Sequence, residues 1–216
     1  MARRILPALL AFGVISLILA LDPPQPRPAG ARSNMPALRK TGAPLTGEGS
    51  CADCHGTKVN NTGNGSLTIT TPTTYTPGQV YTITVTEQDP GQARWGFELT
   101  ALKDSDHSMG GAIASTTTLT GTGASNGITY IAQTTGTGGD GTFNGTANGP
   151  VSWSFQWTAP ASGSGAVTFY AAGAAANTSG TPDNGDFTYV VTKAVTEEVP
   201  TAVLPTTWGM IKTRYR

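Results

Sequence analysis

The sequence predicts an all-β protein, an antiparallel β-sandwich of immunoglobulin-like type with about seven to eight strands. Three observations support this fold class. The chain of 216 residues contains 28 glycines and 15 prolines, and with abundant threonine these residues favour short strands and tight turns over long helices. Several short runs alternate apolar and polar residues with the period of a half-buried strand. No stretch of the expected sandwich has the period of an amphipathic helix.

Three runs of alternation are clear, at 80–87, 95–101 and 151–157. Weaker strand signals start at Ser66 and cover 112–119, 128–134, 166–172 and 187–192. The run at 166–172 is mostly apolar, which suits a strand that is buried on both faces. The aromatic residues of these runs form the expected core: Trp95, Phe97, Trp153, Phe155, Trp157, Phe169 and Tyr170.

The pentad Cys51-Ala52-Asp53-Cys54-His55 lies before the first strand and contains both cysteines of the chain. Two thiols three positions apart, followed directly by a histidine, are typical of covalent c-type haem attachment. The thiols can add to the two vinyl groups of haem, and the imidazole of His55 can bind the iron from one face. We therefore predict haem c, covalently bound, as the cofactor.

Two other interpretations of the pentad stay open. A CxxC disulfide or redox pair does not need the histidine, and cysteine pairs outside the cytoplasm usually form disulfides. A structural zinc site needs four ligands, usually in two separate pairs. Cys51, Cys54, His55 and His107 are all the cysteines and histidines that the chain has, and no second pair has ligand spacing.

The N-terminal segment 1–31 has the features of a secretory signal. Arg3 and Arg4 precede an apolar run from Ile5 to Leu21, and Ala29-Gly30-Ala31 offers a small-x-small cleavage site. The run approaches the length that crosses a bilayer, so an uncleaved anchor is the alternative. Both interpretations predict export, to the periplasm, the cell surface or the medium of a bacterial-type cell.

Composition divides the rest of the chain. We expect a Pro/Ala-rich linker at 32–45, extended and mobile, a haem-attachment loop at 46–65, the sandwich at 66–193, and a C-terminal tail or sorting segment at 194–216. The N-terminal apolar segment or this tail could associate with the cell envelope.

Charge and motifs exclude other functions. Basic and acidic residues balance at 13 each, and only 12% of residues are charged, so no basic field exists for nucleic acid. The chain has no G-x-S-x-G motif, and two histidines leave little for a catalytic triad. We find no catalytic constellation and do not expect an enzyme.

Five stretches occur in a recognisable order: Tyr-Thr-Pro-Gly-Gln-Val-Tyr (75–81), Trp-Gly-Phe-Glu-Leu-Thr-Ala-Leu (95–102), Trp-Ser-Phe-Gln-Trp-Thr-Ala-Pro (153–160), Gly-Ala-Val-Thr-Phe-Tyr-Ala-Ala-Gly (165–173) and Asn-Gly-Asp (184–186). They resemble the choice-of-anchor V domain of bacterial secreted proteins, which is similar to the reelin N-terminal (Reeler) β-sandwich. The family also carries a Gly-Ser-Cys-x-x-Cys-His segment, which Gly49 to His55 match. The resemblance covers about residues 46–192 and implies a secreted or cell-surface sandwich with a haem-attachment segment. It implies no known reaction.

The distal side of the iron is less certain from the sequence. Members of the family often have a histidine in the strand that matches 129–135, where this chain has Gln133. His107 and Met109 lie together on a polar loop, and either is a candidate sixth ligand. The acidic loop residues are candidates for calcium, although neither run matches a full calcium loop: Asp104, Asp106, Asp183, Asn184 and Asp186.

The function predicted from these observations is an exported monohaem electron-transfer or redox module with an unknown redox partner. The alternative is a structural or adhesive surface module with a Cys51–Cys54 disulfide and no haem.

Overall fold

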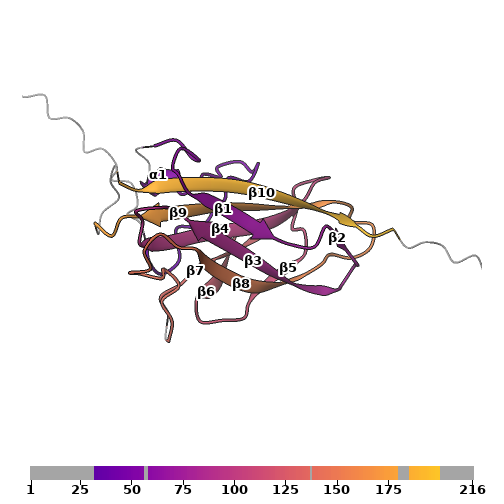
Figure 1. Ribbon diagram of the computed structural model, residues 1–216. Helices are drawn as coiled ribbons and strands as arrows, with labels where there is room; N and C mark the ends of the chain where they lie inside the picture. Colours follow the sequence, from indigo (N-terminus) through magenta and orange to yellow (C-terminus); the bar gives the residue numbers. More distant parts are fainter. Residues whose placement is uncertain (1–31, 56–57, 137, 180–184, 200–216) are drawn as a thin grey trace, which may run out of the picture.

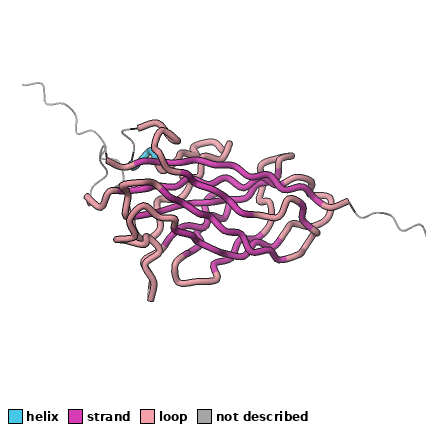
Figure 2. Tube along the Cα trace, viewed as in Figure 1, coloured by secondary structure: helices cyan, strands magenta, loops and turns pink. Residues whose placement is uncertain are grey.

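The computed structural model describes residues 32–55, 58–136, 138–179 and 185–199. These residues form two packed β-sheets and one short helix, α1 (Ala52–His55) (Figures 1 and 2). One sheet has the order β1 (Ser66–Thr70), β3 (Val80–Gln88), β8 (Val151–Thr158) and β5 (Ala112–Ser115). The other has the order β2 (Thr74–Tyr75), β10 (Phe187–Glu197), β9 (Val167–Ala176), β4 (Arg94–Lys103), β7 (Ile128–Gln133) and β6 (Thr120–Ser125). The predicted all-β sandwich is confirmed.

The strands pair antiparallel, except for a short parallel contact between β2 and β10. Two strands lie outside the predicted runs. β2 has only two residues and pairs with the end of β10. β6 is interrupted by glycines and has little apolar content, so its pairing with β7 could not be predicted from a periodic pattern. β10 also continues past the predicted end at 192 to Glu197, beyond the expected start of the tail.

The core lies between the sheets and consists of the inward residues of each alternating strand. The rings of Phe97 and Trp153 meet across the sheets with centroids 4.5 Å apart, and those of Trp157 and Phe169 meet at 5.0 Å. Six of the seven predicted core aromatics are fully buried. Tyr170 is the exception, because it pairs with Thr100 and both point to the outer face of the six-stranded sheet.

Residues 32–49 lie over the outer face of the six-stranded sheet, in contrast to the mobile linker that we expected at 32–45. The backbone of Met35 donates to the carbonyl of Gln133 at 3.1 Å, Ala43 is buried, and Thr41 pairs with Ser50 in an isolated bridge. The segment is attached by backbone hydrogen bonds and by separate apolar contacts of Leu38, Ala43 and Leu45, which do not form a periodic pattern.

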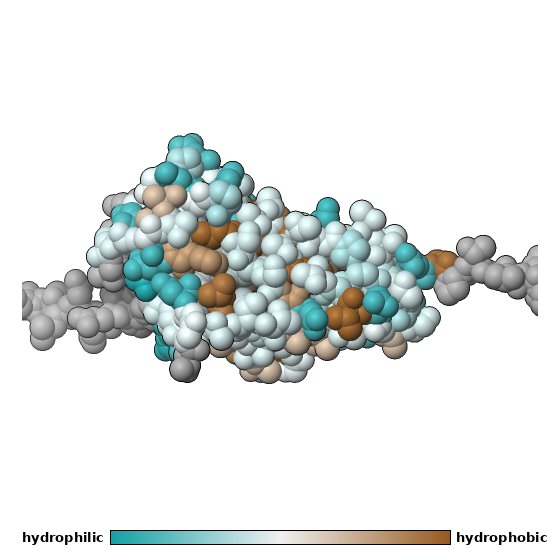
Figure 3. All heavy atoms as spheres, turned by 60° about the horizontal axis from the view of Figure 1, so that its bottom comes forward, coloured by the Kyte–Doolittle hydropathy of each residue, from teal (hydrophilic) through white to brown (hydrophobic). Residues whose placement is uncertain are grey.

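On the face turned forward in Figure 3, most atoms are pale, since they belong to residues of intermediate hydropathy, and apolar residues form small separate patches. Among the described residues, no helix is long and apolar enough to cross a membrane. The predicted signal segment 1–31 lies outside the described residues.

Candidate functional site

The pentad forms the one-turn helix α1 at the edge of the sandwich, beside β10 (Figure 1). The amide of His55 donates to the carbonyl of Cys51 at 3.0 Å, which closes the turn. Residues at i, i+3 and i+4 share one face of a helix. Cys51 directly precedes α1, Cys54 and His55 belong to it, and all three line the same cavity.

Side-chain hydrogen bonds anchor the start of this turn to β10. The hydroxyl of Ser50 accepts the amide of Ala52 at 3.3 Å, in the manner of a helix N-cap. The same hydroxyl accepts from the side chain of Asn60 at 3.0 Å, and the carbonyl of that amide accepts the hydroxyl of Thr188 at 2.7 Å. This chain of hydrogen bonds connects the start of the pentad to β10.

The imidazole of His55 is oriented by Asp186, which directly precedes β10. Nδ1 of His55 lies 2.7 Å from Oδ2 of Asp186, and the Asp186 side chain is almost completely buried. Its other oxygen accepts the amide of Asn177 at 3.2 Å. A carboxylate accepts from Nδ1–H, so the Nδ1 of His55 carries a hydrogen in this contact. In the neutral form of the ring, the lone pair is then on Nε2.

The two cysteines have different surroundings. Cys51 is 8% exposed and packs against Ala172, Ala174 and Val190, and burial raises the pKa of its thiol well above the usual value. Cys54 is only partly buried, and neither thiol is joined to the other. The disulfide of the alternative interpretation is therefore not formed. A thiol with a raised pKa is also a poor nucleophile at neutral pH, which disfavours a thioredoxin-like redox pair.

A cavity of about 230 Å³ opens beside the pentad. Its base is the outer face of β4 and β9, where Gly96 pairs with Ala174 and Arg94 pairs with Ala176. The small residues leave a shallow hollow in the sheet. Arg32 and Lys40, from the segment that crosses the sheet, also line the cavity.

Gln133, at the end of β7, lines this same cavity. Its Oε1 accepts the backbone amide of Phe97 at 2.7 Å, and its Nε2 donates to the carbonyl of Arg32 at 3.3 Å. A Cβ added to Gly96 would lie 3.1 Å from Nε2. The position at which the resemblance places a histidine in other members therefore faces the pentad cavity here.

The two predicted distal ligands lie elsewhere. His107 and Met109 line a second pocket with Tyr130, and Met109 pairs with Leu102 in an isolated bridge. Leu102 is six residues along β4 from Gly96, which at about 3.4 Å per residue is roughly 20 Å. The sulfur of Met109 instead accepts the amide of Thr129 at 3.2 Å. The structure does not bring either residue to the pentad.

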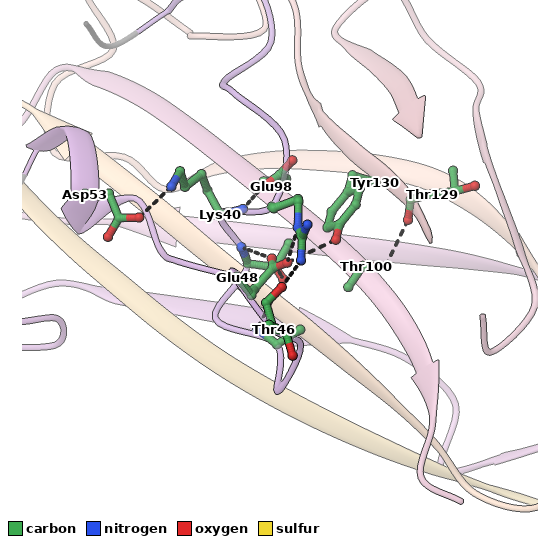
Figure 4. Close-up of polar contacts among 11 residues, drawn as sticks. Lys40, Thr46, Glu48, Asp53, Glu98, Thr100, Thr129 and Tyr130 are labelled. Atoms are coloured by element: carbon green, nitrogen blue, oxygen red, sulfur yellow. Dashed lines mark hydrogen bonds and ion pairs between the residues drawn. The ribbon is translucent and has the colours of Figure 1, made fainter. Parts of the chain in front are cut away.

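Glu98 is a buried carboxylate that lies beneath residues 32–49 (Figure 4). Glu98 points to the outer face of β4, and one of its oxygens accepts the backbone amide of Lys40 at 2.5 Å. The other oxygen has no partner, and burial raises the pKa of Glu98 to about 8. The Lys40 side chain extends to Asp53 of α1 at 2.5 Å. Lys40 thus connects this carboxylate to the helix that carries the pentad.

A second carboxylate, Glu48, connects other parts of residues 32–49 to each other and to β7. It accepts the backbone amide of Thr41 at 2.9 Å and the hydroxyl of Tyr130 at 3.0 Å, and Arg39 lies 3.8 Å away. Together these contacts fix the path that leads into the pentad (Figure 4).

Sequence reasoning missed three elements of this site. Asp186 was considered only as a calcium ligand, although the Asn-Gly-Asp motif that contains it was a signal. Gln133 was noted as a departure from a family pattern, and its place in the cavity depends on the sheet register. Gly96 and Ala174 belong to strands whose inward aromatic residues dominate the pattern. Of the calcium candidates, Asp183 and Asn184 lie outside the described residues.

Among the described residues, no group of three or more His, Cys, Asp and Glu side chains is arranged to hold a metal ion by itself. This finding concerns a metal bound by protein ligands alone. A haem iron takes four of its ligands from the ring and needs only one from the chain on the proximal side.

No family model matches the chain, and no curated protein matches it. The solved structures that are similar to it include two domains of F-spondin. The Reelin-N domain of F-spondin is 22% identical, with a TM-score of 0.42, over 67% of this chain and 94% of the other. The human F-spondin reeler domain is 20% identical, with a TM-score of 0.43, over 67% of this chain and 95% of the other.

Proposed function

We propose that this chain is an exported β-sandwich module that carries one haem, attached through thioether bonds to Cys51 and Cys54, and that it transfers single electrons. The observation that carries the proposal is the joint placement of the pentad. Cys51, Cys54 and His55 lie at or directly before α1 and line one cavity. Asp186 holds the imidazole with Nε2 free.

The residues of the cavity fit a flat, largely apolar ring. The base is made of Gly96, Ala174 and Ala176, and a side chain at Gly96 would crowd Gln133. The cationic groups of Arg32 and Arg94 line the same space and can neutralise the two carboxylates of haem. The volume of about 230 Å³ is below the roughly 300–1,000 Å³ of small-molecule pockets, so the cavity would enclose only a part of a haem, and most of the ring would lie in solvent. An exposed edge suits electron exchange with a partner protein.

Each residue has a distinct task in this proposal. Cys51 and Cys54 would hold the haem through thioether bonds, since each S–H can add across one vinyl group without an oxidant. His55 would supply a nitrogen ligand, and Asp186 orients its imidazole. When bound, the haem supplies one-electron chemistry, and its surroundings set the reduction potential.

The experiment is to express the full chain in a host that attaches haem c after export. We expect a red protein whose Soret band survives denaturation and acetone extraction, because the link is covalent. Cys51→Ser combined with Cys54→Ser should lose the band, whereas His107→Ala, in the other pocket, should keep it. A colourless wild-type protein of apoprotein mass, purified from a host that loads a control cytochrome, would contradict the proposal.

A second candidate is a structural or adhesive module without haem, and two observations favour it. Cys51 packs as an ordinary small apolar residue against Ala172 and Ala174, and the sandwich core is complete without the pentad. In addition, the outer face of the four-stranded sheet presents uncharged hydroxyls in register, among them Thr84 with Ser154 at 2.9 Å. A folded, colourless protein with two titratable thiols would support this candidate.

A further inference from the structure

Three cationic side chains gather around the cavity beside α1. The basic residues in the described part of the chain are Arg32, Arg39, Lys40, Lys58, Arg94, Lys103 and Lys193. Three of these, Arg32, Lys40 and Arg94, line this one cavity, whereas Asp186 supplies the single carboxylate among its described lining residues. The cavity therefore carries an excess of positive charge in a chain whose formal net charge is zero.

Two of the three cations have no carboxylate partner among the described residues. Lys40 pairs with Asp53 at 2.5 Å, but neither Arg32 nor Arg94 forms an ion pair with any described residue. Asp140 attracts Arg94 electrostatically, yet its oxygens accept hydrogen bonds from its own loop instead. Two guanidinium groups at the rim are thus available to an anion from solvent.

The carboxylate of the lining does not neutralise these arginines. Asp186 is almost completely buried, and one of its oxygens lies 2.7 Å from Nδ1 of His55. Its other oxygen accepts the amide of Asn177 at 3.2 Å. Both oxygens are engaged by these partners, so the positive charge at the rim stays uncompensated from within the cavity.

A neutral donor lies in the same space. Oε1 of Gln133 accepts the backbone amide of Phe97 at 2.7 Å, and its Nε2 donates to the carbonyl of Arg32 at 3.3 Å. An NH₂ group carries two hydrogens, so one N–H of this fixed amide remains for an acceptor in the cavity. The donor groups of the lining therefore suit an oxygen anion.

The base of the cavity is uncharged and made of small residues. Gly96 is paired with Ala174, and Ala176 is paired with Arg94, all on β4 and β9. The volume of about 230 Å³ is below the roughly 300–1,000 Å³ of pockets for drug-sized molecules. A ligand that fits has a compact apolar body on the base and a negative group at the rim.

An organic carboxylate fits these features better than phosphate does. A guanidinium binds either group through two parallel hydrogen bonds. Phosphate, however, is polar on every side, and the oxygens turned to the small apolar residues would lose water without gaining a partner. The hydrocarbon body of an organic acid gains free energy when it leaves water.

We propose that this cavity binds a small organic carboxylate, with Arg32 and Arg94 as its charge partners and its hydrocarbon body over Ala174 and Ala176. The inference goes beyond the proposed function and does not require haem. It is tested on the full chain from a host that attaches no haem, because the carboxylates of a haem would compete for the same arginines. The outcome is therefore independent of whether haem is attached in a competent host.

The probe is butyrate, followed by nuclear magnetic resonance at low ionic strength. We expect saturable binding of one butyrate per chain and a shift of the side-chain amide signal of Gln133. Butyramide, which has nearly the same shape without the charge, and inorganic phosphate should each bind at least about tenfold more weakly, the factor that corresponds to about 1.4 kcal/mol. This comparison uses the wild type alone, so it stands even where a variant does not fold.

Four variants locate the site. Arg32→Gln and Arg94→Gln should each weaken butyrate binding at least about tenfold, since each removes charge-assisted hydrogen bonds. Lys103→Gln, at the other end of β4 and outside the cavity, removes the same charge and should leave the affinity unchanged. Ala176→Leu keeps every charge but fills the base, and it should also weaken binding.

Three results would overturn the inference. The first is a wild type that does not bind butyrate. The second is binding of butyramide or phosphate as tight as that of butyrate, because the site would then recognise no carboxylate. The third is an equal butyrate affinity in folded Arg94→Gln and Lys103→Gln, because the anion would then respond to the net charge of the chain rather than to this cavity.

Discussion

The two faces of the six-stranded sheet are built from opposite kinds of residue. On the inner face of β4, Trp95, Phe97 and Leu99 are large and completely covered by the other sheet. On the outer face of the same strand, Gly96 leaves a hollow and Glu98 is a buried acid. The inner face is covered by the other sheet. The outer face is covered in part by residues 32–49, which lead into the pentad.

We attribute most of the stability of the fold to the inner face and the candidate site to the outer face. The inner face removes large apolar areas from water, at roughly 25 cal/mol per Å², and it also covers the carboxyl group of Glu87 from the facing sheet. The outer face places a cavity, two thiols and an oriented imidazole together. The predictions below test this division, in order of the expected size of the effect.

The largest effect is expected from the inner face. Phe97→Ala should lower the free energy of unfolding by about 3–5 kcal/mol, because it leaves a cavity beside Trp153. Urea denaturation followed by tryptophan fluorescence measures it. Thr82→Ala, on the exposed face of β3, is the matched control and should cost less than about 1 kcal/mol. If Phe97→Ala lowered the free energy of unfolding by less than Thr82→Ala does, the inner face would not be the main source of stability.

The outer face should make the stability depend on pH. The pKa of Glu98 is about 8 in the folded chain, against an ordinary value of 4.5, so the folded state retains a proton that the unfolded state releases. The stabilisation is complete below about pH 4.5 and is lost as the pH rises through 8, by an amount on the order of a few kcal/mol. Denaturation at pH 5 and pH 8.5 should show this loss.

Glu98→Gln is the control for that measurement, since it keeps the acceptor for the Lys40 amide and cannot titrate. The free energy of unfolding of this variant should still fall with pH, but less steeply, because the pKa of Glu87 is also raised by burial. If the free energy of unfolding depended on pH equally in the variant and the wild type, Glu98 would not titrate as described.

The attachment of α1 should respond more modestly. Asn60→Ala removes the bonds to Ser50 and Thr188, at about 1 kcal/mol each. Hydrogen exchange of the His55 amide, which closes the turn, should become faster, while amides of β8 should keep their protection. Unchanged exchange at His55 would mean that backbone contacts alone hold the pentad.

The smallest effect is expected at the surface pair of Lys40 and Asp53. Asp53→Asn should change stability by about 0.2–1 kcal/mol, less at high salt, because Asp53 is half exposed. Thermal denaturation at low and high ionic strength measures it. A larger, salt-independent loss would assign the pair a structural role in α1.

The alternation of apolar and polar residues predicted the inner face of the sheet well, but it predicted almost nothing about the outer face. The period of Trp153, Phe155 and Trp157 reports burial directly, so the sandwich and its core could be found without coordinates. The cavity depends on register, which brings Gly96 of one strand beside Ala174 of another. Long-range polar pairs such as His55 with Asp186, 131 residues apart, leave no periodic signal. The pentad was recognisable because its spacing is local.

The most direct test of the account is the mass of one peptide. Trypsin cleaves after Lys40 and Lys58, so it releases residues 41–58 with both cysteines of the chain. From protein exported by a host that attaches haem c, we predict this peptide with the added mass of one haem and no free thiol. The same peptide at its unmodified mass, with two thiols that alkylate or with a disulfide between them, would contradict the haem on the outer face.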